Sequence, residues 1–220
     1  MGIFENFERE GKGISKDAPP KTGIRLFIDI ISREFWTFIW LNLLFIFCSI
    51  PIVTIGASYS ALNSVIIKMI KDKPVDIIYD FKKAFKKNIV QGTLAFFITA
   101  IISGLLFFAY NFYFITSPAM SYLIIGLSFL LLMINNYVFP LIVCVKLKLS
   151  HIYKNSLNLA FICLKYSITS AFLNVLLFVV CFILFPSSVL YILLFGFSFA
   201  CFLNSFFVYK NIKTYVEEKN

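Results

Sequence analysis

The chain has 220 residues and a formal net charge of +9, yet 60% of its residues are hydrophobic, only 14% are charged, and its mean hydropathy is +0.88. Soluble domains carry about 25% charged residues, so this composition excludes a soluble enzyme, a secreted disulfide scaffold and a disordered tail. Ionised side chains are missing from three long windows, residues 35–67, 88–145 and 166–209. We therefore expect an all-α protein, a polytopic transmembrane helix bundle.

The chain begins with a charged stretch that contains no apolar run and no cleavable signal peptide. We expect residues 1–22 to form a cytoplasmic segment, residues 23–210 a single transmembrane domain and residues 211–220 a cytoplasmic tail. Within residues 24–35, apolar and charged side chains recur on opposite faces at helical spacing. This pattern predicts an amphipathic surface helix ahead of the first window.

The first window is broken by the run Ile50 to Gly56, which contains Pro51. A helix needs about 20 apolar residues to cross the bilayer, so this window is long for one crossing and short for two. Its second arm, Ala57 to Ile70, either crosses or forms a re-entrant half-helix. The total is about six spans, or five plus a re-entrant pair.

The other two windows each predict a hairpin of two spans behind an amphipathic helix. The second hairpin has spans at 89–115 and 122–145, joined by a turn that contains Pro118, and follows a helix that begins at Pro74. The third has spans at 166–184 and 189–209 and follows a helix over 149–160. The bundle is therefore predicted as three hairpins, each preceded by a cytoplasmic surface helix.

The 20 Lys and Arg residues fall only in the segments 1–34, 68–87, 146–165 and 210–220, and the three turns between spans contain none. Short loops rich in Lys and Arg remain cytoplasmic, so both termini are expected on the cytoplasmic side of the membrane. The basic faces of the surface helices contact either a protein partner or anionic lipid. The residues concerned are Lys82, Lys83, Lys86, Lys87 and Lys154.

No charged side chain lies within a predicted span, and no catalytic motif or group with metal-ligand spacing is present. We expect no enzyme activity, no cofactor, no metal site and no nucleic-acid partner. The five cysteines are scattered singly, as small buried hydrophobic residues are.

Neutral polar residues remain within the spans, and they permit two interpretations. They line a cavity for a neutral, hydroxyl-rich ligand, or they join helices by hydrogen bonds. Pro140 cannot donate to the carbonyl four residues earlier, so the Asn136 carbonyl needs a donor from a neighbouring helix. The asparagines concerned are Asn42, Asn63, Asn135, Asn136, Asn174 and Asn204.

The segment 49–64 carries small residues at every fourth position, Gly56, Ser60 and Ser64, which permits close helix packing. Pro51 and Gly56 bracket a bend, and Thr54 lies within it. A broken helix of this kind is also typical of transporter binding sites, so packing and ligand binding are both open here.

The first window and the helix after it resemble the YesL-like family of bacterial integral membrane proteins, a domain of unknown function. The residues that carry the resemblance are Asn42, Pro51, Thr54, Gly56 and Ala57, then Asp80, Phe81, Phe85 and Asn88, and, less specifically, Lys154, Asn155 and Ala160. The resemblance implies a multi-pass protein of Gram-positive bacteria, often encoded beside carbohydrate ABC transporters. It implies no catalytic residues.

Two functions follow as expectations. The first is an accessory or regulatory component of oligosaccharide uptake, whose partners are the lipid bilayer and ABC transporter subunits or other membrane proteins. The alternative is a small permease or exporter that binds a neutral solute through the asparagine and threonine residues of its spans. The oligomeric state is left open by the sequence.

Overall fold

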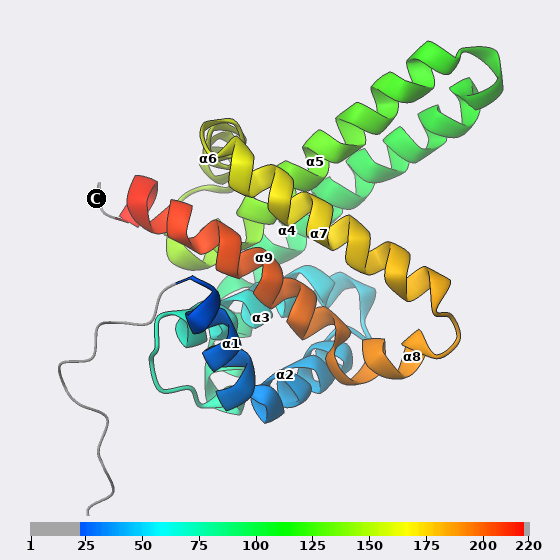
Figure 1. The fold of residues 1–220 in the computed structure, drawn as a ribbon. Coiled ribbons are helices and arrows are strands. Elements are labelled where there is room, and N and C mark those ends of the chain that lie inside the picture. The colour runs from blue at the N-terminus through cyan, green and yellow to red at the C-terminus, as the bar shows by residue number, and fades with distance from the viewer. Residues whose placement is uncertain (1–22, 218–220) are drawn as a thin grey trace, which may run out of the picture. The chain divides into compact units, whose positions relative to one another are not determined.

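The computed structural model describes residues 23–217, which contain helices and no β-strand. The chain divides into two compact units, residues 1–33 and 34–220, each of which is described by itself. The helices, labelled in Figure 1, are α1 (Ile24–Arg33), α2 (Phe35–Cys48), η1 (Ile52–Thr54), α3 (Ile55–Ile70), α4 (Ile77–Thr116), α5 (Pro118–Cys144), α6 (Leu149–Ile162), α7 (Leu164–Ile183), α8 (Ser188–Tyr191), η2 (Ile192–Gly196), α9 (Phe197–Ile212) and η3 (Lys213–Glu217).

The N-terminal unit contains α1, the helix predicted from the amphipathic pattern of residues 24–35. Its first residues follow Gly23, whose φ of +62° is a conformation that glycine adopts at low cost. The Phe27 amide donates to the Gly23 carbonyl, and Arg33 lies 3.9 Å from Asp29 one turn earlier. The predicted segment 1–22 lies outside the described residues, as do residues 218–220.

Within residues 23–217, five helical segments are long and apolar enough to cross a membrane, which confirms the prediction of a polytopic helix bundle. These are Ile52–Ile70, Ile77–Thr116, Pro118–Cys144, Leu164–Ile183 and Ser188–Val216. A sixth crossing is reached only when α1 and α2 are taken together. The second and third predicted hairpins therefore correspond to α4 with α5 and to α7 with α8 to η3.

Two boundaries differ from the predicted ones. The amphipathic stretch expected ahead of the second hairpin is not a separate helix, because α4 runs through it without a break for 40 residues, about 60 Å. Asp76 caps this helix by accepting a hydrogen bond from the Tyr79 amide at 3.0 Å, and no proline interrupts it. At the other end of the chain, α9 continues past residue 210, so that Asn211 and Ile212 are buried rather than part of a tail.

Helix α3 is largely buried in the 34–220 unit, with neighbours α2, α4, α5 and α9. Its closest approach is to α4, where Gly56 faces Gly92. A Cβ atom added at Gly92 would lie 2.6 Å from the Gly56 carbonyl oxygen, and one at Gly56 would overlap the Gly92 carbonyl. The small-residue pattern of the sequence thus coincides with the tightest helix contact.

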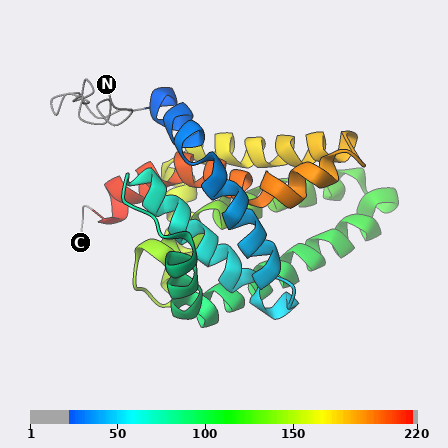
Figure 2. The same cartoon turned by 90° about the horizontal axis from the view of Figure 1, so that it is seen from below.

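The charged connections of this unit gather at one end and the bare turns at the other. In Figures 1 and 2 the turns after α2, α4 and α7 lie toward the right, whereas the α3–α4 connection, the α5–α6 connection and the end of α9 lie toward the left. Two side-chain contacts link different helices and connections at the charged end. The Lys71 ammonium lies 4.9 Å from the Tyr209 ring centroid, and the Gln91 side chain donates to the Leu147 carbonyl at 3.0 Å.

Candidate functional site

The polar centre of the bundle is built around the carbonyl group that Pro140 leaves without a helical donor. Pro140 lies inside α5, and the side chain of Asn204 on α9 donates to the Asn136 carbonyl oxygen at 3.0 Å. Both asparagines are buried. The acceptor predicted from the sequence is therefore present, and a neighbouring helix supplies its donor.

A ring of hydrogen bonds joins α5, α7 and α9 at this point. The Asn136 amide donates to the Ser170 hydroxyl at 3.2 Å, and that hydroxyl donates to the Asn204 side-chain oxygen at 2.6 Å. Asn174 donates to the Ser170 carbonyl at 3.0 Å and lies 3.5 Å from the Asn136 side-chain oxygen. Each donor in the ring is directed at a protein acceptor.

A second chain of hydrogen bonds joins the same three helices one turn away. Asn211 donates to the Tyr137 hydroxyl at 3.1 Å, Tyr137 lies 3.0 Å from the Ser167 hydroxyl, and Ser167 donates to the Cys163 carbonyl at 2.9 Å. Sequence reasoning missed these residues. The spacing of Ser167, Ser170 and Asn174, which share one face of a helix, was the signal available.

Asn135, adjacent in sequence to Asn136, faces a different helix pair. Its side-chain oxygen accepts from the Thr99 hydroxyl of α4 at 2.9 Å, and Thr99 lies 3.4 Å from the Tyr153 hydroxyl of α6. Tyr153 donates to the Ala95 carbonyl at 3.1 Å. Burial raises the pKa of Tyr153, so its hydroxyl remains a donor at neutral pH.

Asn63 and Asn42 likewise bond to neighbouring helices. Asn63 on α3 donates to the Tyr59 carbonyl at 2.9 Å and accepts from the Ser205 hydroxyl of α9 at 3.1 Å. Asn42 on α2 donates to the carbonyls of Ile192 and Leu193, at 3.0 and 2.7 Å.

The partner of Asn42 is the π-helical segment η2, where the ordinary helical pairing of backbone groups is interrupted. Besides its two donated bonds, the Asn42 side-chain oxygen accepts from the Ser198 backbone amide at 3.0 Å. One buried amide thus satisfies three backbone groups around η2. Sequence inspection identified Asn42 but gave no sign of the π-helix.

The bend between α2 and α3 is held by Thr54. Its hydroxyl lies 2.6 Å from the Cys48 carbonyl and 2.7 Å from the Pro51 carbonyl. Pro51 is exposed at the start of η1, and Gly56 lies two residues beyond Thr54, in the α3–α4 contact. Of the residues predicted in this segment, Pro51 and Thr54 therefore form part of a turn, and Gly56 forms part of a helix crossing.

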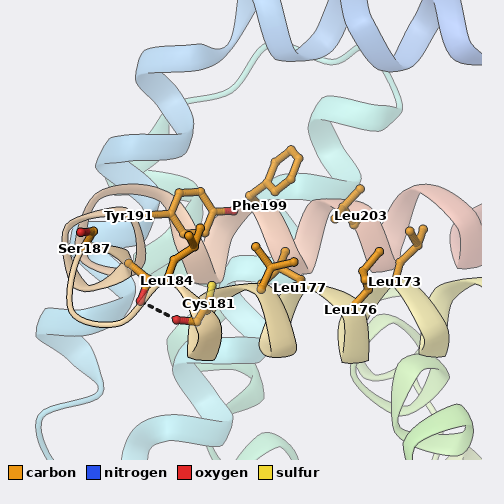
Figure 3. Close-up of a pocket in the computed structure, with 11 residues that line it drawn as sticks. Leu173, Leu176, Leu177, Cys181, Leu184, Ser187, Tyr191, Phe199 and Leu203 are labelled. Atoms are coloured by element: carbon orange, nitrogen blue, oxygen red, sulfur yellow. Dashed lines mark hydrogen bonds between the residues drawn. The ribbon is translucent and has the colours of Figure 1, made fainter.

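A cavity with a volume of about 520 Å³ lies elsewhere, between α7 and the α8–α9 segment. Figure 3 shows that mainly leucine side chains point into it, with Tyr191 and Phe199 from the opposite side. The Ser188 hydroxyl donates to the Cys181 carbonyl at 2.6 Å at one end. None of the predicted asparagines lines this apolar groove.

The predicted lysines lie at the charged end of the unit. Lys82, Lys83, Lys86 and Lys87 are exposed on the first turns of α4, and Lys154 is exposed on α6. The Lys83 ammonium lies 5.5 Å from the Tyr79 ring centroid. These side chains form a basic surface rather than a cluster around one point.

Comparison with known proteins gives one match. Residues 38–110 are similar to a family described as a protein of unknown function, DUF624. The match covers about one third of the chain. No curated protein and no solved structure matches.

The matched segment runs from α2 into the second half of α4 and includes the Gly56–Gly92 crossing. Asn42, Thr54 and Asn63 lie within it, as do the lysines of α4. The hydrogen-bonded ring around Asn136 lies outside it.

Proposed function

We propose that this protein is an accessory or regulatory component of oligosaccharide uptake in a bacterial cytoplasmic membrane, without catalytic activity of its own. Both termini and the charged connections lie in the cytoplasm. There the basic surface of α4, defined by Lys82, Lys83 and Lys86, contacts a membrane partner such as a transporter subunit.

The proposal is supported by a contrast between the polar groups within the spans, which are bonded inside the protein, and the lysines of α4, which are exposed. The asparagine side chains within the spans are bonded to neighbouring helices or backbone carbonyls, and no intramembrane charge exists in the three windows to define an ion or substrate path. The exposed lysines of α4, in contrast, lie on a helix that is too long for one crossing at about 60 Å. Its first turns are therefore available for contact outside the hydrocarbon layer.

The permease alternative receives less support from the geometry. A site for a neutral, hydroxyl-rich solute requires polar groups that converge on a cavity. The asparagines proposed for that site bond to each other, to serine and threonine hydroxyls or to the backbone, and the 520 Å³ groove is lined mainly by leucine. The same polar groups therefore act best as interhelical contacts.

The carbohydrate part of the proposal rests on the resemblance to YesL-like proteins of Gram-positive bacteria, through Asn42, Pro51 and Thr54 in the first window and Asp80, Phe81 and Asn88 in α4. Members of that family are often encoded beside carbohydrate ABC transporters. The similarity of residues 38–110 to a family of unknown function adds no activity.

Co-purification tests the proposal. The tagged full-length chain is extracted in mild detergent from cells grown on different oligosaccharides, and bound proteins are identified by mass spectrometry. We expect a transporter subunit or sensor to be retained, and to be lost with the triple variant Lys82→Gln, Lys83→Gln and Lys86→Gln.

A matched control removes the same charge elsewhere. Lys165→Gln, Lys210→Gln and Lys213→Gln alter three exposed lysines on other helices. Retention of the partner by this control and its loss from the α4 variant supports a specific surface. Recovery of the protein alone under every growth condition, or equal loss from both variants, would overturn the proposal.

A further inference from the structure

A second cavity, separate from the asparagine ring, lies at the charged end of the bundle between α4 and the α5–α6 connection. Its volume is about 430 Å³. Three lysines line it, Lys87, Lys146 and Lys148, and no carboxylate does. No ion pair links these lysines to another residue of the described range 23–217, so their positive charge is not neutralised within it.

The connection between α5 and α6 carries two of the three lysines. It begins and ends in extended backbone, at Val145 and Lys148, and Lys146, Leu147 and Lys148 all line the cavity. Leu147 packs against the apolar core, and its carbonyl is held by the Gln91 side chain at 3.0 Å. Lys146 and Lys148 are exposed and line the cavity.

The strongest sign of a ligand is Asn88. Asn88 is only 4% exposed and lines this cavity, yet no residue of the described chain forms a hydrogen bond with its side chain. Unlike the hydroxyls of Ser49, Ser58 and Ser156, which are enclosed without a partner, the amide atoms of Asn88 are not fully enclosed. The other buried asparagines of the bundle have protein partners, so the amide of Asn88 is available to donate into the cavity.

The start of α6 adds further positive potential. Lys148 is the residue before the first turn of this 14-residue helix, and no side chain caps it. The first backbone amides of a helix lack helical acceptors and attract anions. Three ammonium groups, a free amide and a helix N-terminus together match a phosphate group, which carries several acceptor oxygens.

The sequence positions of the lysines that line the cavity indicate the source of the phosphate. Lys87 directly precedes the charge-free window 88–145, and Lys146 directly follows it. The cavity therefore lies where the hydrocarbon layer meets the headgroup layer. Apolar residues, Val90, Ile142 and Val145, complete its lining.

We propose that this cavity binds the phosphate of an anionic phospholipid, with Lys87, Lys146 and Lys148 as charge partners and Asn88 as a hydrogen-bond donor. The lipid is held at the cytoplasmic leaflet and fixes the α5–α6 connection against α4. This site is independent of the partner proposed above, because it requires only the chain and the membrane.

Lipid binding by the purified full-length protein tests the site. Phosphatidylglycerol is titrated into the detergent-solubilised chain and bound lipid is quantified by native mass spectrometry, with phosphatidylcholine as the zwitterionic comparison. The double variant Lys146→Gln and Lys148→Gln should weaken phosphatidylglycerol binding about tenfold or more, since each lysine near anionic lipid contributes on the order of fivefold. The matched pair Lys165→Gln and Lys213→Gln, exposed on other helices and outside the cavity lining, should weaken it less than about threefold.

Asn88→Asp provides a second variant of nearly the same shape, which places negative charge in the cavity and should also reduce binding. Circular dichroism and size-exclusion profiles that match the unmodified protein show that the variants are folded. Equal losses from the two lysine pairs, or no preference for phosphatidylglycerol, would overturn the site. Inorganic phosphate at millimolar concentration is added as competitor, and displacement of the lipid by it would overturn the lipid source in favour of a soluble phosphate.

Discussion

Asn204 donates a hydrogen bond to the Asn136 carbonyl oxygen across the α9–α5 contact, at 3.0 Å. This carbonyl has no helical donor because Pro140 occupies the position four residues later. A break in the hydrogen bonding of one helix is thus compensated by a side chain from another. The same asparagine accepts from Ser170 of α7, so that three helices meet at one buried amide.

Asn204→Leu should lower the free energy of unfolding by about 1–2 kcal/mol, because it removes two interhelical bonds of a strength typical for membrane helices. Pro140→Ala should recover part of this loss, since alanine restores a backbone donor for the Asn136 carbonyl. Unfolding of the four proteins of this double-mutant cycle, followed by circular dichroism in detergent, measures both effects.

The control for this cycle is Asn111→Leu. Asn111 is exposed and its side chain bonds only to the Phe107 carbonyl of its own helix. Its substitution should change stability by less than about 0.5 kcal/mol. A loss as large as that of Asn204→Leu, or the absence of any recovery with Pro140→Ala, would contradict the assigned role of the carbonyl.

Gly56→Ala should destabilise the bundle by about 1–3 kcal/mol, because the added methyl group overlaps the Gly92 carbonyl and lies 2.6 Å from the Phe96 Cβ atom. Because the nearest atoms belong to the Gly92 backbone, a side-chain adjustment alone cannot relieve the overlap. Gly104→Ala is the matched control, since nothing lies within 4 Å of a Cβ atom placed there. It should leave stability unchanged or raise it slightly through better helix propensity. Thermal unfolding of both variants measures the difference.

Much of the fold could be predicted because the cost of placing charge in hydrocarbon outweighs the other energies that act on this chain. The windows 88–145 and 166–209 contain no ionised residue, and each overlaps two of the helical segments that are long enough to cross. Helix boundaries within polar segments were predicted less well. The surface helix expected from Pro74 is the first part of α4, because nothing in the sequence between 77 and 88 stops a helix.

The candidate site was predicted at the level of individual asparagines but not of their partners. The Asn136 carbonyl could be identified because a proline four residues later has a local and certain effect. The partners Ser170, Asn204 and Ser205 depend on how α7 and α9 rotate against α5 and α3. That rotation is set by packing over the whole bundle, which no local pattern encodes. Asn88 and Lys148 are 60 residues apart in sequence and share a cavity only because α4 and the α5–α6 connection are adjacent.

Asn42→Leu should destabilise the region around η2, because three backbone groups lose the partner that the Asn42 amide provides. The expected loss is about 2 kcal/mol, from three bonds of about 0.6 kcal/mol each. Hydrogen exchange by mass spectrometry should show faster exchange in residues 192–198 than in α4. Uniform acceleration throughout the bundle, or no change in this segment, would argue against a local role. Asn158→Leu, an exposed site on α6, is the control.

The charge distribution predicts which ends of the helices face the outside of the cell. Cysteine introduced at Ala119 or Ser187, both exposed at turns without lysine or arginine, should react with a membrane-impermeant maleimide on intact cells. Cysteine at Lys83 should react only after the cells are permeabilised, because a short lysine-rich connection remains cytoplasmic.

The five native cysteines contribute background labelling by the maleimide, and the protein without an introduced cysteine measures the level of this background. Cys163 is buried and burial raises the pKa of its thiol, so it contributes little thiolate at neutral pH. Protection at positions 119 and 187 together with labelling at 83 on intact cells would show that the orientation is the reverse of the one proposed. It would also move the basic surface of α4 and the phosphate cavity to the outer leaflet, where a cytoplasmic partner could not reach them. The same three probes therefore test the orientation that the partner proposal requires and that assigns the lipid to the cytoplasmic leaflet.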